Sequence, residues 1–183
     1  MMNRSLVLIL CIAISGALHA QNTRSAKAVY TVQQELTDAG AEVTRRQYQE
    51  FDKRGNVIVE ITFHADSSIR KKETWSYDRK DREVSHSEYR NDTILLQRTV
   101  TTYDRFDDKE QVIVYDGSGG VIEITRLTYG PFGKKESETT VDGSGKLLRK
   151  ITYAYDARGA MIRKSTYDDQ NRLIAERTWS YTY

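Results

Sequence analysis

The chain has 183 residues, with 28 Lys and Arg against 26 Asp and Glu, and a formal net charge of +2. A nucleic-acid partner would need a dense basic stripe, so this near-balance of charge argues against nucleic-acid binding. The mean hydropathy of −0.66 is low for a domain with a thick apolar core. Such a value ordinarily indicates disorder, but the regular recurrence of aromatic residues described below argues against it.

The N-terminus has the layout of a secretory signal peptide. Arg4 precedes an apolar run over residues 6–18, and Ala20 stands where a cleavage point would follow. The run is too short to span a bilayer comfortably as a permanent helix. We therefore expect residues 1–20 to be a signal peptide. The protein would be exported to the periplasm, the cell surface or the medium, and no stable membrane span would remain after cleavage. The alternatives are an uncleaved anchor and, because of Cys11, a lipid anchor.

Beyond this segment, aromatic residues recur with a constant period. A first aromatic column returns every 26 residues, at Phe51, Tyr77, Tyr103, Tyr129, Tyr155 and Tyr181. A second column lies near the middle of each period, at Phe63, Tyr89, Tyr115, Val141 and Tyr167. A fixed period of this length is typical of repeat architectures, in which each unit packs against its neighbours. We expect residues 21–36 to lead into the first strand and residues 37–183 to form the repeat domain.

Each period contains two turns and two strands. In the last full copy, Asp156 opens a four-residue turn that Gly159 closes, as expected for a type I turn followed by a residue with positive φ. Similar turn chemistry recurs at Asp52, Asp116, Asp142, Asp168 and the segment Gly130-Pro131-Phe132-Gly133. The segments between turns are rich in Thr, Val, Ile and Tyr and lack helical spacing, so they indicate strands. The predicted fold is all-β: antiparallel hairpin repeats of 26 residues stacked into an elongated, twisted open sheet or a β-solenoid-like array.

Strand alternation sorts the side chains of each copy onto two faces. Leu173, Ala175, Arg177, Trp179 and Tyr181 share one face, and mostly polar residues share the other. This predicts a sheet with one wet face, in which stacked Tyr and Trp columns form the core.

The turn and its flanking residues resemble the YD repeat of the RHS family. The segment Tyr155-Asp156-Ala157-Arg158-Gly159 carries the motif, and Tyr167-Asp168-Asp169-Gln170-Asn171-Arg172-Leu173 matches it further. Earlier copies depart from it, because His64 and Arg90 stand where the Asp would open the turn. The resemblance implies coiled β-sheet shells, which enclose toxin domains in some members and are linked to carbohydrate binding in others. MORN-like repeats are a second, lower-ranked resemblance.

Chemistry-bearing constellations are sparse. His64 and His86 lie in different units without the spacing of a zinc site. Asp-rich turns such as Asp168-Asp169 lack the calcium-loop pattern. No Ser–His–Asp partnership is suggested. We expect a protein that is not an enzyme and has no metal, cofactor or catalytic residues.

Two functions remain open. The first is a binding or scaffold module for a protein or carbohydrate at the cell envelope, with Trp75, Tyr77, Trp179 and Tyr181 as a flat stacking surface. These rings are alternatively structural columns of a thin sheet. The second function is a structural or assembly component of an envelope or secretion complex. Such a component would dock through an exposed sheet edge at residues 176–183.

Overall fold

The computed structural model describes residues 7–12, 27–37 and 40–183. Most of the predicted signal peptide lies outside these residues. Its stretch Val7–Ile12 is described as strand β1, which pairs antiparallel with β2 (Ala28–Thr37). Export therefore stays a prediction. Strand β2 falls largely within the segment that the sequence assigns to the lead-in before the repeats.

The chain divides into two compact units, residues 1–97 and residues 98–183. The described part of the first unit contains β1, β2 and the strands β3 Gly40–Phe51, β4 Val57–Phe63, β5 Ile69–Tyr77 and β6 Glu83–Arg90. Strand β7 (Ile94–Tyr103) crosses the boundary. The second unit continues with β8 Lys109–Asp116, β9 Val121–Tyr129, the short 3-10 helix η1 Pro131–Gly133, β10 Lys135–Asp142, β11 Leu147–Tyr155, β12 Met161–Tyr167 and β13 Leu173–Thr178.

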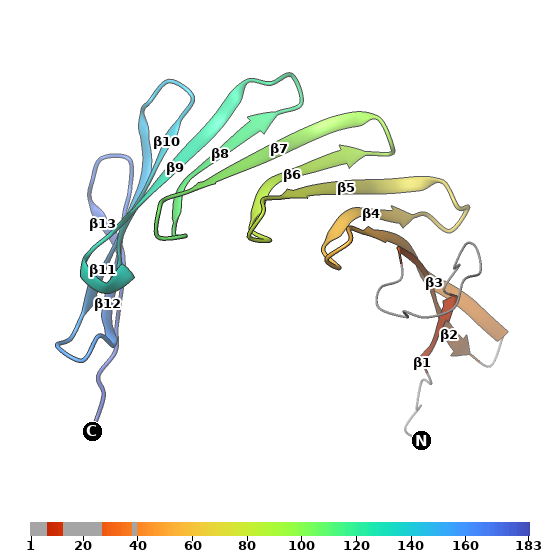
Figure 1. Ribbon diagram of the computed structural model, residues 1–183, viewed down its shortest axis with the longest axis horizontal. Coiled ribbons are helices and arrows are strands. Elements are labelled where there is room, and N and C mark those ends of the chain that lie inside the picture. The colour runs from red at the N-terminus through yellow and green to blue at the C-terminus, as the bar shows by residue number, and fades with distance from the viewer. Residues whose placement is uncertain (1–6, 13–26, 38–39) are drawn as a thin grey trace. The chain divides into compact units, whose positions relative to one another are not determined.

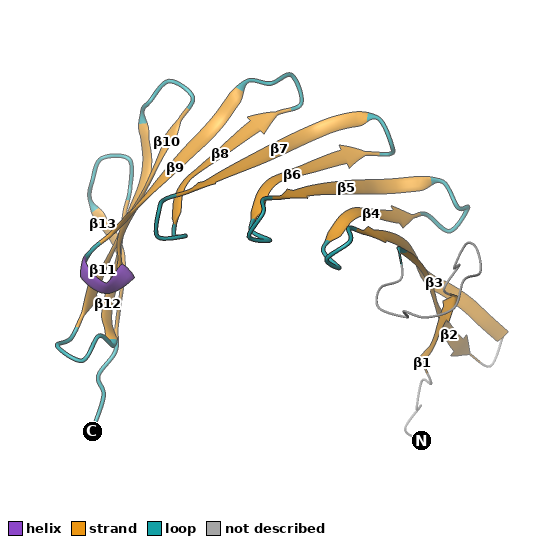
Figure 2. Ribbon diagram, in the orientation of Figure 1, coloured by secondary structure: helices purple, strands orange, loops and turns teal. Residues whose placement is uncertain are grey.

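Sheet order equals chain order. Neighbouring strands in the sheet are neighbours in the sequence, from β1 to β13, and from β3 onward consecutive strands are joined by short described loops (Figure 1). Apart from η1, the described chain consists of strands and connecting loops (Figure 2). The predicted all-β fold of stacked antiparallel hairpins in an open sheet is confirmed.

Aspartate side chains shape most of the turns. In the Asp156 turn, Oδ1 accepts hydrogen bonds from the backbone N–H groups of Arg158 (2.9 Å) and Ala160 (2.8 Å). Gly159 adopts a left-handed φ of 79° and donates its N–H to the Asp156 carbonyl at 2.9 Å. A carboxylate that accepts two turn N–H groups stabilises this conformation locally. The same pair of N–H contacts recurs at Asp52, Asp78, Asp104, Asp116, Asp142 and Asp168.

Two groups of turns differ from the sequence prediction. Ser67, Asp81 and Asp107 take the left-handed position that glycine or asparagine was expected to occupy. Short polar side chains tolerate this conformation better than bulky ones do. The segment Gly130–Gly133 was wrongly grouped with the Asp turns: it forms η1, no side chain caps it, and Phe132 and Gly133 have φ values of 65° and 67°. Gly130 has no carboxylate to accept the turn N–H groups, so the backbone takes another course.

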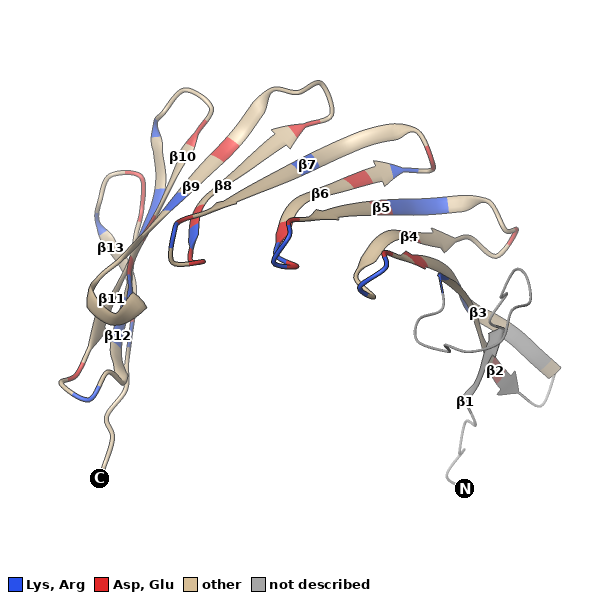
Figure 3. Cartoon of the chain, in the orientation of Figure 1, with Lys and Arg blue, Asp and Glu red and all other residues tan. Residues whose placement is uncertain are grey.

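Burial is slight, because the described secondary structure forms a single layer. All described strands belong to one sheet, and within the described residues only the three-residue η1 is helical. Ile151 is the one buried hydrophobic residue among those described, whereas Thr140 and Ser165 are buried small polar residues. The Tyr and Trp columns, half-buried except at the exposed Tyr181, are therefore supports rather than a closed core. Along the part of the chain that the structure describes, acidic and basic residues are mixed on strands and turns, without a basic stripe (Figure 3).

Candidate functional site

The first aromatic column has a structural task that recurs along the chain. Tyr77, at the end of β5, donates its hydroxyl to the carbonyl of Val57, the first residue of β4, at 2.9 Å. The same bond, to a carbonyl 20 residues earlier, is made by Tyr129 to Lys109, Tyr155 to Lys135 and Tyr181 to Met161. Each of these hairpins is thus closed by a turn at one end and by a tyrosine hydroxyl at the other. We call this bond the tyrosine clamp.

Trp75 and Tyr77, two of the predicted stacking residues, lie in the first unit at the end of β5. The Trp75 ring stacks on the His86 imidazole of β6, with ring centroids 5.0 Å apart and planes inclined by 6°. His86 Nε2 lies 3.1 Å from a carboxylate oxygen of Glu73. Trp75 is half-buried, and the Tyr77 hydroxyl serves the tyrosine clamp. Both rings therefore have partners within the protein.

Trp179 and Tyr181 lie in the second unit, just beyond β13. The backbone N–H of Trp179 donates to the Ile162 carbonyl at 3.0 Å, which continues the pairing with β12. Tyr181 is 47% exposed, and its ring centroid is 6.2 Å from that of Tyr183. This pair is more open than Trp75 and Tyr77. The two pairs belong to different units, and ligand stacking stays a prediction.

Hydrogen-bond donors in the turns lower the pKa of several turn carboxylates. The Arg82 guanidinium lies against Asp78, with Nε at 2.8 Å from Oδ2, and lowers the pKa of Asp78 to about 2. The Ser144 hydroxyl likewise lowers the pKa of Asp142, and hydrogen bonds from turn N–H groups add a smaller lowering. These oxygens already accept hydrogen bonds from their own turns. Among the described residues there is no cluster of three or more His, Cys, Asp or Glu side chains placed to hold a metal ion.

A polar network on β10 and β11 escaped sequence analysis. Glu138 Oε1 accepts hydrogen bonds from Lys135 Nζ (2.7 Å) and the Tyr153 hydroxyl (2.8 Å). Burial alone would raise the pKa of Glu138, but these two donors outweigh it and lower that pKa. Burial, together with the bond to Glu138, raises the pKa of Tyr153. Lys135 and Lys164 also approach the Tyr153 ring, at 5.4 and 5.9 Å from its centroid. The i,i+3 spacing of Lys135 and Glu138 was the only signal in the sequence.

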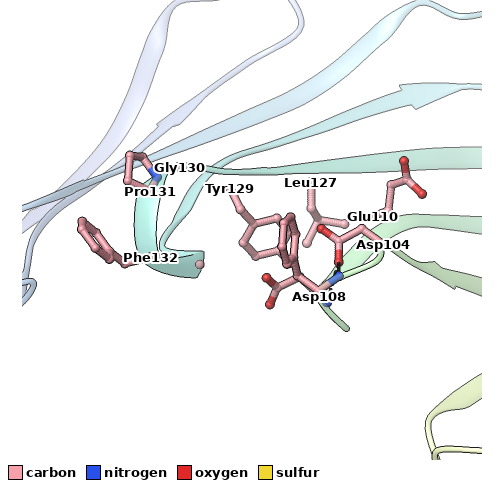
Figure 4. A pocket seen from close by; sticks show the side chains of 10 residues that line it. Asp104, Asp108, Glu110, Leu127, Tyr129, Gly130, Pro131 and Phe132 are labelled. Carbon is pink, nitrogen blue, oxygen red and sulfur yellow. Dashed lines mark hydrogen bonds between the residues drawn. The ribbon is translucent and has the colours of Figure 1, made fainter.

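A groove of about 670 Å³ lies between the Asp104 turn and the Gly130 turn in the second unit. Its lining combines acidic and apolar residues: Asp104, Phe106, Asp108, Glu110, Leu127, Tyr129, Gly130, Pro131, Phe132 and Gly133. Figure 4 shows Leu127, Tyr129 and the three carboxylates on one side of the Gly130 turn, with the Phe132 ring directed away from them. Sequence analysis missed this groove. The available signal was the departure of residues 130–133 from the Asp-first pattern.

Tyr129 links the groove to the sheet. Its hydroxyl forms a tyrosine clamp with Lys109, at 2.9 Å. Burial is the largest cause of the raised pKa of Tyr129; Lys135 opposes it, and the Asp108 and Asp104 carboxylates reinforce it. These carboxylates therefore interact electrostatically with the Tyr129 side chain. The groove presents an aromatic surface beside carboxylates, an arrangement suited to a cationic group.

No protein-family model matches the sequence, and no curated protein matches it. Solved structures do resemble the fold. The crystal structure of TcdB2-TccC3-TEV matches with a TM-score of 0.63 and 16% identity, over 93% of this chain and 8% of that chain. The crystal structure of TcdB2-TccC3 matches with a TM-score of 0.62 and 15% identity, over 88% and 8%. A mutant of the Photorhabdus luminescens Tc holotoxin pore matches at 0.57 and 15%, over 84% and 8%.

At these identities the likeness shows the fold alone. The chain spans only 8% of the length of these toxin-complex chains. The neighbours support an RHS-like β-repeat fold, as the turn motifs led us to expect.

Proposed function

We propose that this chain is an exported, non-enzymatic scaffold module of the cell envelope that works by joining its sheet to protein partners. The observation that supports this most is the single uncovered sheet, which within the described residues has Ile151 as its one buried hydrophobic side chain. A sheet with so little core of its own gains stability when a partner covers or extends it. Membership of the YD-repeat family belongs to the same proposal, and so does the absence of enzymatic activity.

Strand β13 is the edge at which a partner would add. It ends the sheet order and, among the described residues, pairs only with β12. All six of its residues are exposed, including Leu173 at 53% and Ile174 at 61%. Edge strands present backbone N–H and C=O groups that another chain can pair with. Strand addition gives affinity through these main-chain bonds and specificity through alternate side chains.

The neighbouring structures are parts of toxin complexes, which supports an assembly role over a soluble catalyst. Among the described residues no helix is long and apolar enough to cross a membrane. Envelope location rests on the predicted signal peptide, and cell fractionation of the tagged protein tests it. Recovery in the cytoplasm with an intact N-terminus would contradict export.

Photo-crosslinking tests the edge. A photoreactive amino acid at Ile174 should give adducts with another protein in intact cells, because this residue lies on the terminal strand. Leu148 is the matched control: it lies 26 residues earlier at the same repeat position and is also exposed, but β11 has strands on both sides. Adducts at position 174 and not at 148 are expected. Monomer alone at both positions would overturn docking through β13.

The finer form of the proposal, a glycan or protein bound by aromatic rings, has its own test. A Trp75→Ala, Trp179→Ala double variant should lose binding on a glycan array or in a pull-down while its circular dichroism stays unchanged. Loss of the β-sheet signal would instead show that the rings are structural.

A further inference from the structure

The groove between the Asp104 and Gly130 turns differs in charge from the other gaps between turns on the same side of the sheet. Its lining includes three carboxylates, those of Asp104, Asp108 and Glu110, and no lysine or arginine. Glu110 is exposed and Asp108 is half-buried, so both can reach a bound group. Among the described residues, no ion pair engages these two side chains. The groove is therefore a concentration of negative charge in a chain of nearly balanced charge.

Two equivalent gaps in the array are each filled by a cation of the chain itself. In the first unit, Arg54 reaches from its own turn to the next, where Nη1 lies 2.8 Å from the Arg79 carbonyl and 2.8 Å from Asp81 Oδ1. In the second unit, Lys134 reaches the turn one 26-residue period further on, where Nζ lies 3.0 Å from the Gly159 carbonyl. In both gaps a positively charged side chain bridges two successive turns.

The repeat supplies no such cation at the groove. Counting 26-residue periods, Phe106 stands at the position of Arg54, and Asp108 at the position of Lys134. At these two repeat positions the groove therefore has an aromatic ring and a carboxylate, where the bridged gaps have Arg54 and Lys134. Phe106 is 69% exposed and Phe132 is 98% exposed, so apolar surface at the rim is also left open.

We propose that this groove binds an arginine or lysine side chain from an extended segment of a protein partner, which takes the place of the missing bridging cation. The carboxylates would hold the charged head beside the Tyr129 ring, where cation–π attraction adds to the ion pairs. Pro131 and Phe106 would contact the aliphatic stem and flanking apolar residues. Arg105, in the same turn, has its guanidinium 4.6 Å from the Phe106 ring centroid and is not a lining residue.

The partner's chemistry follows from this arrangement: a basic and apolar segment, favoured by charge complementarity with the groove. The site is separate from the β13 edge. Its test is therefore independent of the edge-docking proposal.

Isothermal titration with two short synthetic peptides tests the inference on the whole protein. One peptide alternates arginine and leucine, and the other carries neutral citrulline in place of each arginine. The arginine peptide should bind, and an Asp108→Asn, Glu110→Gln variant should weaken that binding by about tenfold or more. An Asp92→Asn, Asp169→Asn variant removes the same charge from exposed positions outside the groove and should bind like the parent.

A Phe106→Arg variant gives a second, opposite readout. It restores an arginine at the repeat position of Arg54, so it should fill the groove, abolish peptide binding and leave the β-sheet signal in circular dichroism intact. Equal binding of the arginine and citrulline peptides would overturn the proposal. So would unchanged binding by the Phe106→Arg variant, a measurement that holds even if the carboxylate variant fails to fold.

Discussion

Strands β11 and β13 occupy the same position in the repeat, 26 residues apart, yet their environments differ. Ile151 in β11 is 8% exposed, whereas Arg177, its counterpart in β13, is exposed. Strand β11 lies between β10 and β12, while β13 has β12 alone among the described residues. The difference shows that burial in this fold comes from flanking strands rather than from a second layer, because each unit rests only on its neighbours.

Truncating Ile151 should give the largest effect. Ile151→Ala removes the buried hydrophobic side chain of β11 and should lower the free energy of unfolding by about 2–3 kcal/mol in urea denaturation. Arg177→Ala, at the equivalent edge position, should cost less than about 1 kcal/mol, since it removes only an exposed contact with Trp179. Equal losses in the two variants would refute the distinction between the strands.

Glu138 tests the polar support of β11. Glu138→Gln weakens the hydrogen bonds from Lys135 and Tyr153 and should cost about 1 kcal/mol at pH 7. The folded-state pKa of Glu138 is lowered from 4.5. Its stabilisation is therefore fully present above pH 4.5 and is lost as pH falls through the lower folded-state pKa.

Thermal unfolding followed across this acid range should show the parent and the Gln variant converging. Glu136→Gln, at an exposed neighbouring position, should differ little from the parent at either end of the range. A gap between the parent and the Glu138 variant that widens on acidification would contradict the assigned role.

Substitutions in the turns before β11 and β13 should change the free energy of unfolding by less than the truncation of Ile151 does. Gly145, before β11, has a φ of 90°, and an added Cβ would meet no atom within 4 Å. Gly145→Ala should therefore cost roughly 1–2 kcal/mol through backbone strain alone. Asn171, its counterpart before β13, has a φ of 58°, and Asn171→Gly should change stability by less than about 0.5 kcal/mol. Denaturant midpoints with unchanged slopes would measure both.

Replacing Ile174 should have the smallest effect on stability. Ile174→Ser alters a side chain that is already exposed on the edge, so the free energy of unfolding should shift by less than about 0.5 kcal/mol. A melting temperature well below that of the parent would show that β13 is covered within the protein itself.

The recurring aromatics predicted the strand boundaries closely. Tyr77, Tyr103, Tyr129 and Tyr155 are the last residues of β5, β7, β9 and β11. The Asp-first turns could be predicted because they depend on a local effect: one short carboxylate accepts hydrogen bonds from two neighbouring N–H groups, and a few residues of sequence are enough to indicate it. The period and the turn chemistry therefore contain most of the fold.

The candidate site was less accessible, because it depends on contacts between copies. The hydroxyl partner of Tyr77 is a carbonyl 20 residues away, and only the register of the strands reveals it. The groove arises because Phe106 and Asp108 stand at the repeat positions that Arg54 and Lys134 occupy in other copies. The bridging role of those two cations is known only from their contacts in the structure, so the sequence alone could not reveal the groove. Left-handed Asp81 and Asp107 were missed because glycine is the usual marker of that conformation.

The tyrosine clamp has a consequence for how such a protein changes in size. The β8–β9, β10–β11 and β12–β13 hairpins each carry both of their own fastenings, a turn carboxylate at one end and a ring hydroxyl at the other. Removing or duplicating a full 26-residue period would keep each tyrosine hydroxyl opposite a backbone carbonyl. Adding or deleting about six residues would leave a tyrosine hydroxyl without its carbonyl acceptor. Length in this architecture is thus free to vary in steps of one repeat.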